Sequence, residues 1–329
     1  MHIWRTSFEA AVLAAGLVWA FPHTGPAQTD KYPSRVITLV VPYLPGGAPD
    51  VIGRLAAQHL SNDLRQNVIV ENRPGAGGTV GTGVVVKAPP DGYTLLLGST
   101  DTIVINSHFY KKLPFNPLTD LSAVAMISYA PEFVLVNASL PVASLREFIE
   151  FARAKSGELN YSSPGIGTIP HLAGDRLARL IGTKMTHIPF RGGAPATQEV
   201  ATGNVQLTIM TKATADPFAQ AGKIKILAIA SSKRFDGLPD VPTAAEAGLP
   251  GYEIDNWWGI FAPKGTSPEI IARLNAGTQR MLDDPAIESL FKRQGFLPAR
   301  TTVQEFEELI RQSDPRWKEI VIEAGVQAE

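Results

Sequence analysis

The sequence contains no cysteine, which excludes disulfides, thiolate catalysis and cysteine-ligated metal sites. It also has little net charge, because 30 lysines and arginines stand against 31 acidic residues, for a formal charge of −1. Nucleic-acid-binding proteins need a basic field, so this balance argues against a nucleic-acid partner. The balance also gives no reason to expect binding to an anionic membrane.

Enzyme signatures are also missing from the sequence. No G-x-S-x-G elbow and no H-E-x-x-H motif is present, and no nucleophile–base pair is evident. The histidines after the N-terminal segment are scattered without metal-ligand spacing; they are His59, His108, His171 and His187. Of these we expect only His171 to lie near a ligand cleft, where a structural hydrogen bond is an equal alternative. The sequence therefore predicts no catalytic residue, no metal and no cofactor.

The N-terminal segment is typical of a secretory signal peptide. An apolar run over residues 10–21 is too short to span a bilayer, which needs about 20 residues. Arg5 precedes this run, and the small residues of "TGPA" offer an A-x-A-like cleavage site near Ala27. We therefore expect residues 1–27 to be removed and the mature protein to be exported. A retained N-terminal anchor is the alternative.

Strand-like and helix-like segments alternate through the rest of the chain. Seven apolar, largely β-branched runs predict buried strands; they cover 35–41, 67–72, 93–99, 133–137, 159–163, 205–210 and 224–231. Stretches with helical spacing of apolar residues lie between them. Such alternation predicts an α/β fold with mostly parallel sheets.

Two extended segments, 126–137 and 250–263, indicate crossings between domains. After the second crossing the chain is nearly all helical, over 267–283, 285–294 and 302–324. Because these helices bring little sheet of their own, they must pack on a domain that already exists. We therefore expect a discontinuous first domain (30–129 plus 252–329) and an inserted second domain (130–251), joined by two connections that form a hinge.

The segment GGAP occurs twice, each time between an apolar run and a helix-like stretch. Glycines permit tight turns and close approach of a ligand to the backbone. A proline at the start of each helix leaves the preceding amides free at the positive helix end, which favours an anion. A third glycine-rich loop, 162–168, precedes another helix. The three loops together predict an anion-binding cleft, although each by itself could be an ordinary strand–helix turn.

Three neighbouring features are more ambiguous. Asp50 follows the first GGAP. A role of Asp50 in capping or ordering the loop is favoured over contact with the ligand, because its carboxylate would repel an anion. Arg191 precedes the second GGAP and either faces an acid or lies in solvent. The segment "ENRPGAGGTVGTG" at 71–83 misses the third glycine of G-x-G-x-x-G by one position, so a structural turn is favoured over a nucleotide site.

The chain resembles the Bug family, the extracytoplasmic solute-binding proteins of tripartite tricarboxylate transporters. The resemblance covers essentially the whole chain after the N-terminal segment, and its most specific blocks are "VENRPGAGG" and "PPDGYTLL". It implies a two-domain Venus-flytrap fold of the periplasmic-binding-protein type II class and a periplasmic location. It also implies capture of a small mono- or dicarboxylate and its delivery to membrane permease subunits. The expected form is a monomer without enzymatic activity. A ligand-sensing subunit, or a hydrolase or lyase using the same cleft, is the alternative.

The resemblance also places a ligand between two jaws of backbone amides. The residues expected in the first jaw are Tyr43, Leu44, Gly46, Gly47, Ala48 and Asp50. Those expected in the second are Ser163, Gly167, Thr168, Arg191, Gly192, Gly193 and Ala194, with His171 nearby. Thr100 and Asp101 follow a strand and are expected to close the site.

The end of the strand at 205–210 bears on the kind of acid. In family members that take amino acids this strand typically ends in a carboxylate, whereas here it ends in Met210. Met210 is expected to form an apolar wall, and Lys212 either faces the cleft or points to solvent. Neither residue balances an ammonium group, so the sequence predicts a non-amino carboxylate as the ligand.

Overall fold

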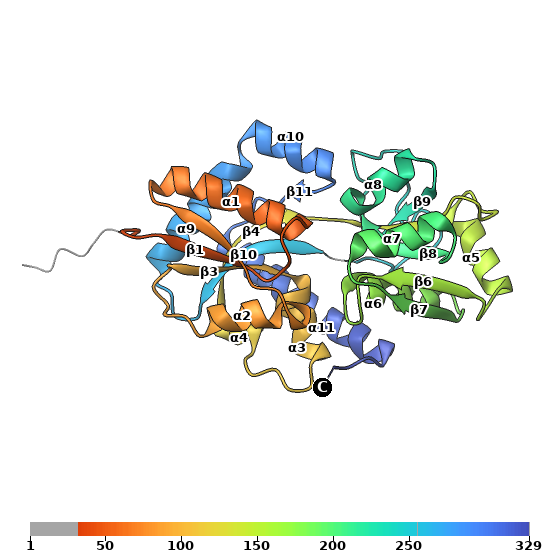
Figure 1. The fold of residues 1–329 in the computed structure, drawn as a ribbon, viewed down its shortest axis with the longest axis horizontal. Helices are drawn as coiled ribbons and strands as arrows, with labels where there is room; N and C mark the ends of the chain where they lie inside the picture. Colours follow the sequence, from red (N-terminus) through yellow and green to blue (C-terminus); the bar gives the residue numbers. More distant parts are fainter. Residues whose placement is uncertain (1–31, 255, 329) are drawn as a thin grey trace, which may run out of the picture. The chain divides into compact units, whose positions relative to one another are not determined.

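A computed structural model describes residues 32–254 and 256–328 of the chain (Figure 1). The predicted signal peptide, residues 1–27, lies outside the described residues, and so does Asp255. Within the described ranges, no helix is long and apolar enough to cross a membrane.

Strands and helices alternate as the sequence predicts. The strands are β1 (Ile37–Val41), β2 (Val68–Asn72), β3 (Thr94–Ser99), β4 (Leu121–Tyr129), β5 (Glu132–Asn137), β6 (Leu159–Ser163), β7 (Met185–Pro189), β8 (Leu207–Thr211), β9 (Ile224–Ile229), β10 (Trp257–Pro263) and β11 (Leu297–Pro298). The α-helices are α1 (Ala48–Leu64), α2 (Thr79–Val86), α3 (Asn106–Phe109), α4 (Pro117–Asp120), α5 (Leu145–Ala154), α6 (Ile169–Leu180), α7 (Gly193–Thr202), α8 (Lys212–Gln220), α9 (Pro268–Leu282), α10 (Pro285–Gln294) and α11 (Val303–Ala324). A 3₁₀ turn, η1 (Ala76–Gly78), precedes α2, and a π-helical turn, η2 (Asp101–Ile105), precedes α3.

The strands form two separate sheets. The first has the order β11-β4-β10-β3-β1-β2 and the second β7-β6-β8-β5-β9. Parallel pairing is confined to β2–β1–β3 and to β7–β6–β8, and the other pairs are antiparallel. The expectation of mostly parallel sheets is therefore wrong. The strands that lead between the sheets, β4, β5 and β10, run against their neighbours instead of following a helical crossover.

Helices cover both faces of each sheet. In the first sheet, one core cluster joins β1 residues such as Leu39 to α1 and α9, and the opposite face packs against α2 and α11. In the second sheet, α5 and α6 cover one face while α7 and α8 cover the other. We call each sheet with its covering helices a lobe, the first lobe containing β1 and the second β6. This confirms the prediction of two α/β lobes.

Three parts of the chain link the lobes. One leads from β4 to β5 and another from β9 to β10, at the two predicted crossings (Figure 1). The domain boundaries at 129/130 and 251/252 stay a prediction. The third link is α11, which packs on β4 and η2 of the first lobe and on α6 of the second. The sequence did not indicate that this helix contacts both lobes.

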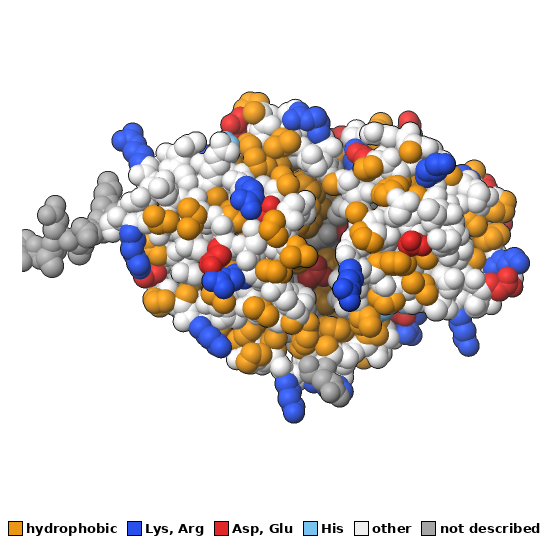
Figure 2. Space-filling view, viewed as in Figure 1, with side chains coloured by type: hydrophobic (Ala, Val, Ile, Leu, Met, Phe, Trp, Pro, Cys, Tyr) orange, Lys and Arg blue, Asp and Glu red, His pale blue; other side chains and the backbone are white. Residues whose placement is uncertain are grey.

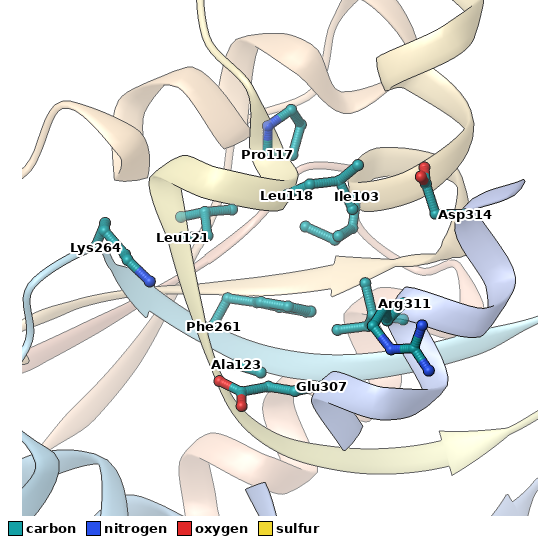
Figure 3. A pocket seen from close by; sticks show the side chains of 11 residues that line it. Ile103, Pro117, Leu118, Leu121, Ala123, Phe261, Lys264, Glu307, Arg311 and Asp314 are labelled. Atoms are coloured by element: carbon teal, nitrogen blue, oxygen red, sulfur yellow. The ribbon is translucent and has the colours of Figure 1, made fainter. Parts of the chain in front are cut away.

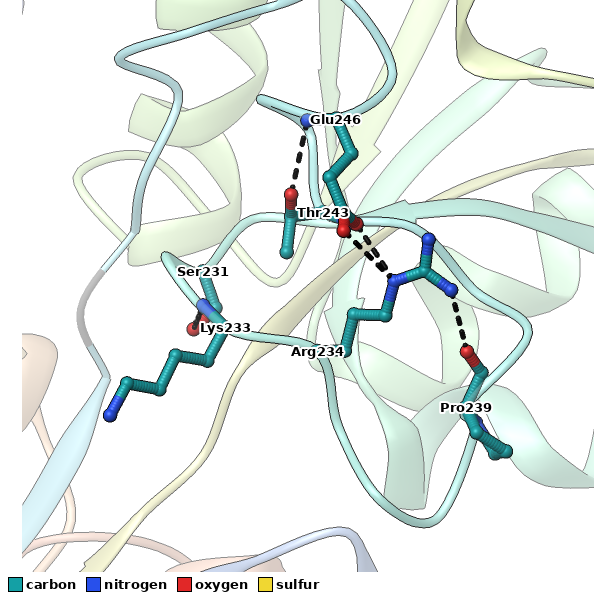
Figure 4. A network of polar contacts seen from close by, with 6 residues as sticks. All are labelled: Ser231, Lys233, Arg234, Pro239, Thr243 and Glu246. Carbon is teal, nitrogen blue, oxygen red and sulfur yellow. Dashed lines mark hydrogen bonds and ion pairs between the residues drawn. The ribbon is translucent and has the colours of Figure 1, made fainter.

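The long segment between β9 and β10 is held by a polar network (Figure 4). Arg234 donates through Nε to both carboxylate oxygens of Glu246, at 3.1 and 2.8 Å, and through Nη1 to the Pro239 carbonyl at 2.9 Å. Glu246 Oε2 also accepts from the Thr243 amide at 2.8 Å. These contacts order the second connection in a stretch that has no regular strand.

Candidate functional site

The first glycine loop leaves backbone amides free at the start of α1. Gly47 is the N-cap of this helix, no side chain caps it, and Pro49 follows within its first turn. The Gly47 and Ala48 amides donate to no described residue. Two free amides at the positive end of a 17-residue helix favour an anion.

Asp50 orders this loop from within. It is 4% exposed and accepts from the Gly46 amide at 2.9 Å, from Arg54 Nε at 3.0 Å and from Asn72 Nδ2 at 2.9 Å. Burial by itself would raise the pKa of Asp50, but the hydrogen bonds from Arg54, Gly46 and Asn72 outweigh it and hold the pKa below its usual value. The Gly46 amide is thus occupied, contrary to the expectation that it is free.

The second GGAP loop repeats this arrangement in the other lobe. Gly192 is the N-cap of α7 with a φ of 123°, which a glycine adopts readily. No side chain caps the helix, and the amides of Gly193 and Ala194 donate to no described residue. Arg191 is exposed and forms no ion pair with a described residue. Figure 1 shows α1 and α7 beginning on the facing sides of the two lobes.

A cavity of about 100 Å³ lies between the lobes. It is lined by Tyr43, Gly77, Asp101, Asn106, Phe109, Tyr110, Ile166, Gly167 and Thr168. Tyr43 comes from the first glycine loop, and the last three residues come from the loop before α6. Figure 2 shows the hollow between the lobes, with acidic side chains at its base. The residues Arg191 to Ala194 do not line this cavity.

Asp101 joins the two lobes at this cavity. Its Oδ1 accepts from the Ile169 amide at the start of α6, at 3.2 Å. Burial raises the pKa of Asp101 to about 7, opposed only by this hydrogen bond. The hydroxyl of Tyr43 forms a hydrogen bond with Ser99 Oγ at 2.6 Å. The pKa of Tyr43 is raised mainly by burial and, to a smaller extent, by the nearby Asp101.

A second buried acid, Glu132, lies at the start of β5, where the first connection enters the second lobe. It is 1% exposed, and its Oε1 accepts from Asn256 Nδ2 at 2.8 Å. Burial raises the pKa of Glu132 to about 8, and the nearby Asp101 adds to this shift. Glu132 Oε2 and Asn256 Oδ1 are buried without a partner among the described residues.

The structure brings Ser163 and His187 together, a contact that sequence reasoning missed. Ser163 Oγ lies 2.6 Å from His187 Nε2 and 2.9 Å from the Gly165 carbonyl. His187 stacks on His171 at 3.9 Å between ring centroids, and burial together with His171 lowers the pKa of His187 to about 4. No described carboxylate pairs with His187, so the contact lacks the third group that would orient a catalytic base.

His171 has the structural role given as its alternative. Its Nδ1 accepts from the Gly167 amide at 3.0 Å, which fixes the loop that lines the cavity. Burial lowers the pKa of His171, so the imidazole is neutral and its Nδ1 can accept.

The remaining predicted residues lie away from the cavity. Thr100 is fully buried and accepts from the Trp257 amide at 3.1 Å. Met210 is 3% exposed and belongs to the core beneath the Gly193 turn, so it forms no cleft wall. Lys212 pairs with Asp216 and packs beside Gly295 of the first lobe, and it does not line the cavity. Leu44 is exposed.

Sequence reasoning also missed several lining residues. Gly77 belongs to the segment interpreted as a structural turn, and its carbonyl accepts from Asn106 Nδ2 at 2.9 Å. Asn106 and Phe109 lie on α3, a short helix that had no strong sequence signal, and Tyr110 follows it. Phe109 packs against Gly167 of the other lobe, which only the tertiary structure brings together.

A larger cavity of about 320 Å³ lies on the first lobe, away from the glycine loops (Figure 3). Its walls are apolar at Ile103, Leu121 and Phe261, with Lys264 and Arg311 at its edges. None of the predicted site residues lines it. The cavity between the lobes is therefore the candidate ligand site.

Comparison with known proteins identifies the family. The model of the tripartite tricarboxylate transporter family receptor matches residues 52–326. The chain belongs to this family. It is 34% identical to Protein BugT of Bordetella pertussis over 301 residues, which are 91% of this chain and 92% of BugT. The resemblance to Bug proteins is thereby confirmed, and the family is one of receptors, not enzymes.

Solved structures of this receptor family share the fold. Rpa4515 of R. palustris with adipate is 33% identical with a TM-score of 0.82, and the match covers 90% of this chain and 99% of that chain. MatC of Rhodopseudomonas palustris with bound malate is 34% identical with a TM-score of 0.78, covering 88% of this chain and 100% of that chain. These likenesses confirm the predicted two-domain solute-binding fold.

Proposed function

We propose that this chain is a periplasmic receptor that captures a small organic mono- or dicarboxylate between its lobes. It hands the acid to the permease subunits of a tripartite tricarboxylate-type transporter. The observation that carries the proposal is the cavity in which Tyr43, from the loop before α1, meets Gly167 and Thr168, from the loop before α6. Each lobe thus supplies one side of the site.

The free helix amides favour an anion between the lobes, although they do not line the cavity of about 100 Å³ itself. The Gly47 and Ala48 amides on one lobe and the Gly193 and Ala194 amides on the other find no acceptor among the described residues. A carboxylate offers lone pairs to such donors and lies favourably at the positive helix end. The relatives solved with adipate and malate hold ligands of this chemical class.

The size of the cavity favours a small ligand. About 100 Å³ is well below the roughly 300–1,000 Å³ of pockets that hold drug-sized molecules. Aliphatic acids of a few carbons therefore fit better than nucleotides or peptides. The phenol rings of Tyr43 and Tyr110 and the ring of Phe109 would enclose the carbon chain of such an acid.

Calorimetry with adipate and malate tests this proposal directly. We expect saturable binding of at least one of these acids, and no binding of the corresponding dimethyl esters, which lack the anionic oxygens. Native mass spectrometry of freshly purified protein should also show a retained small anion. Failure of a wide panel of mono- and dicarboxylates to bind would contradict the proposal. Delivery is tested by uptake of the bound acid in cells that lack the gene, where we expect uptake to be lost.

A further inference from the structure

Asp101 presents a free oxygen to the cavity between the lobes. Its Oδ1 is engaged by the Ile169 amide at 3.2 Å, whereas Oδ2 has no hydrogen bond to a described residue. The side chain lines the cavity of about 100 Å³ beside Tyr43 and Asn106. A molecule held between the lobes therefore meets this carboxyl group.

No cation among the described residues compensates the charge of Asp101. The titratable groups that share its surroundings are acidic or phenolic: Tyr43 from the β1–α1 loop, Tyr110 after α3 and Glu132 at the start of β5. From the second lobe, α6 contributes the Ile169 amide and the neutral His171. The Nδ1 of His171 accepts from the Gly167 amide.

The charged side chains behind η2 are directed elsewhere. On α11, Asp314 accepts from His108 of α3 at 2.6 Å, and Arg311 pairs with Glu308. Asp314, Arg311 and Glu307 line the larger cavity on the first lobe, together with Ile103 of η2. On α4, the carboxylate of Asp120 accepts from the Asn116 amide at 2.8 Å. An ionised Asp101 next to a ligand carboxylate would thus be a buried like-charge pair without a counterion, which is strongly unfavourable.

Building on the proposed function, we propose that Asp101 binds the ligand as a neutral carboxylic acid. Its free oxygen carries the proton and donates a hydrogen bond to a carboxylate of the ligand, so capture of the ligand takes up one proton from solvent. The two carboxyl groups then share one negative charge. The ligand's other carboxylate, where present, is left to the helix amides.

The electrostatics of the free site place the proton uptake in an accessible pH range. Burial raises the pKa of Asp101 to about 7, and an anionic ligand nearby raises the pKa further. The free site is therefore mostly protonated below pH 7 and mostly ionised above it. Because only the protonated form binds, affinity is full at low pH and is lost as the pH rises through the pKa of the free protein.

A neutral acid at position 101 also selects against amino acids. It offers no negative charge to a ligand ammonium group, which would lose its hydration without gaining an ion pair. We therefore expect succinate to bind more tightly than aspartate, and adipate more tightly than 2-aminoadipate. This preserves the preference for non-amino acids on grounds that do not involve Met210 or Lys212.

The test is calorimetry with adipate and malate from about pH 5.5 to about pH 9, where both ligands are fully ionised over most of the range. We expect Kd to be nearly constant below pH 6 and to rise by about tenfold per pH unit above 7. Titrations in buffers of different ionisation enthalpy should show uptake approaching one proton at pH 8 and close to none at pH 5.5.

The variant Asp101→Asn distinguishes binding of the ligand by a protonated carboxylic acid from binding by an ionised carboxylate. Asparagine keeps the shape and the donor, so we expect Kd within a few-fold of wild type at pH 6, no loss of affinity at pH 9 and no proton uptake. Glu132→Gln is the matched control, because Glu132 is another acid near the cavity with a raised pKa, and its loss should keep the wild-type pH slope. Thermal unfolding of both variants checks that the fold is intact.

Three results would overturn the inference. One is a wild-type Kd that stays constant from pH 6 to pH 9 without proton uptake. Another is a loss of more than about 100-fold at pH 6 in Asp101→Asn, which would show that the ionised carboxylate is needed. The last is tighter binding of aspartate than of succinate that disappears in Asp101→Asn. Absence of carboxylate binding at every pH would instead contradict the proposed function itself.

Discussion

Asp50 and Asp101 have the same side chain, but their surroundings drive their pKa values in opposite directions. Asp50 is buried among three hydrogen-bond donors, one of them the Arg54 guanidinium, and its pKa is lowered. Within the part of the chain that the structure describes, Asp101 receives one backbone hydrogen bond and no cation, and its pKa is raised to about 7. The number and charge of the donors that reach each carboxyl group therefore decide its state. Asp50 acts on the loop, and Asp101 faces the cavity.

The buried Glu132 should make the protein less stable as the pH rises. Its folded pKa of about 8 lies above the ordinary 4.5, so the stability it contributes is present below pH 4.5 and is lost as the pH rises to about 8. Glutamine at this position is always neutral and can donate to Asn256 Oδ1, which no described residue partners. We expect the unfolding free energy of Glu132→Gln to exceed that of wild type by a margin that grows by at most about 1.4 kcal/mol per pH unit across this window. Urea unfolding at several pH values measures this, and parallel pH profiles would contradict it.

Gly47 is suited to a steric test of the ligand's position. Its φ is −81°, and a Cβ atom there would meet Pro49 Cδ at 3.6 Å, an ordinary contact. The fold should therefore accept Gly47→Val with a loss of less than about 1 kcal/mol. Binding of adipate or malate should weaken by more than about 100-fold if the acid lies on the Gly47 amide. Calorimetry and thermal unfolding measure the two effects separately.

Gly46 supplies the control for this substitution. It has a φ of +86° with open space around its Cβ position. Gly46→Ala should destabilise the protein by about 1–2 kcal/mol through backbone strain and affect binding only through the loop. A Gly47→Val protein that binds normally would show that this loop does not hold the ligand.

Among the elements, α11 holds together parts that the sheets do not join. Its Phe306 and Trp317 are buried in the core cluster that also contains Leu172 of α6. In addition, Arg176 Nη1 of α6 lies 3.7 Å from Glu323 Oε2 of α11. The helix begins with a capping box, in which Thr302 Oγ1 accepts from the Glu305 amide at 3.1 Å and Glu305 accepts from the Thr302 amide at 2.8 Å. A local signal at 302–305 thus fixes the start of a helix that packs on both lobes.

Loss of the α11 cap should lower global stability. Thr302→Ala leaves the Glu305 amide without its acceptor, and we expect the unfolding free energy to fall by about 1 kcal/mol. Thr302→Ser keeps the hydroxyl and should restore most of this loss. Denaturant unfolding with unchanged m-values would show that the change is one of stability. Equal effects of alanine and serine would contradict the role of the cap.

At the scale of the whole molecule, the two lobes meet at few points around the cavity. Asp101 of the first lobe bonds Ile169 of the second, and Phe109 packs on Gly167, which has a φ of +80°. A Cβ atom at Gly167 would lie 2.6 Å from the Phe109 ring, closer than such contacts allow. Closure of the lobes therefore depends on the absence of a side chain at position 167.

Gly167→Ala should hold the lobes apart. We expect a larger radius of gyration than wild type in small-angle scattering at saturating ligand, and weaker binding of adipate and malate. Wild type should become more compact when the acid is added, because the site is built from both lobes. Gly182→Ala is the control, since it has a similar φ of +67° but open space around its Cβ position. Identical scattering from the Gly167 and Gly182 variants would contradict the role of this contact in closure.

Local sequence signals predicted most of the elements. The β-branched runs became β1, β2, β3, β5, β6, β8 and β9 because apolar segments of this length are buried as strands whatever their neighbours. The C-terminal helices also begin and end close to the predicted residues, since caps and prolines act within one turn. The glycine loops and their free helix amides follow from the same local rules.

By itself the sequence determined the two α/β lobes, the glycine loops at helix starts and, through its motifs, the receptor family. Only the tertiary structure decided which side chains face the cavity and in which protonation state they do so. Met210 became core and Lys212 paired with Asp216, whereas Asp101 lies at a cavity where no described cation pairs with it. Strand direction in β4, β5 and β10 and the contact of α11 with both lobes were likewise settled only in three dimensions. The reason is that caps and apolar periodicity act over a few neighbouring residues, whereas pKa values and pairing partners depend on groups that are remote in sequence.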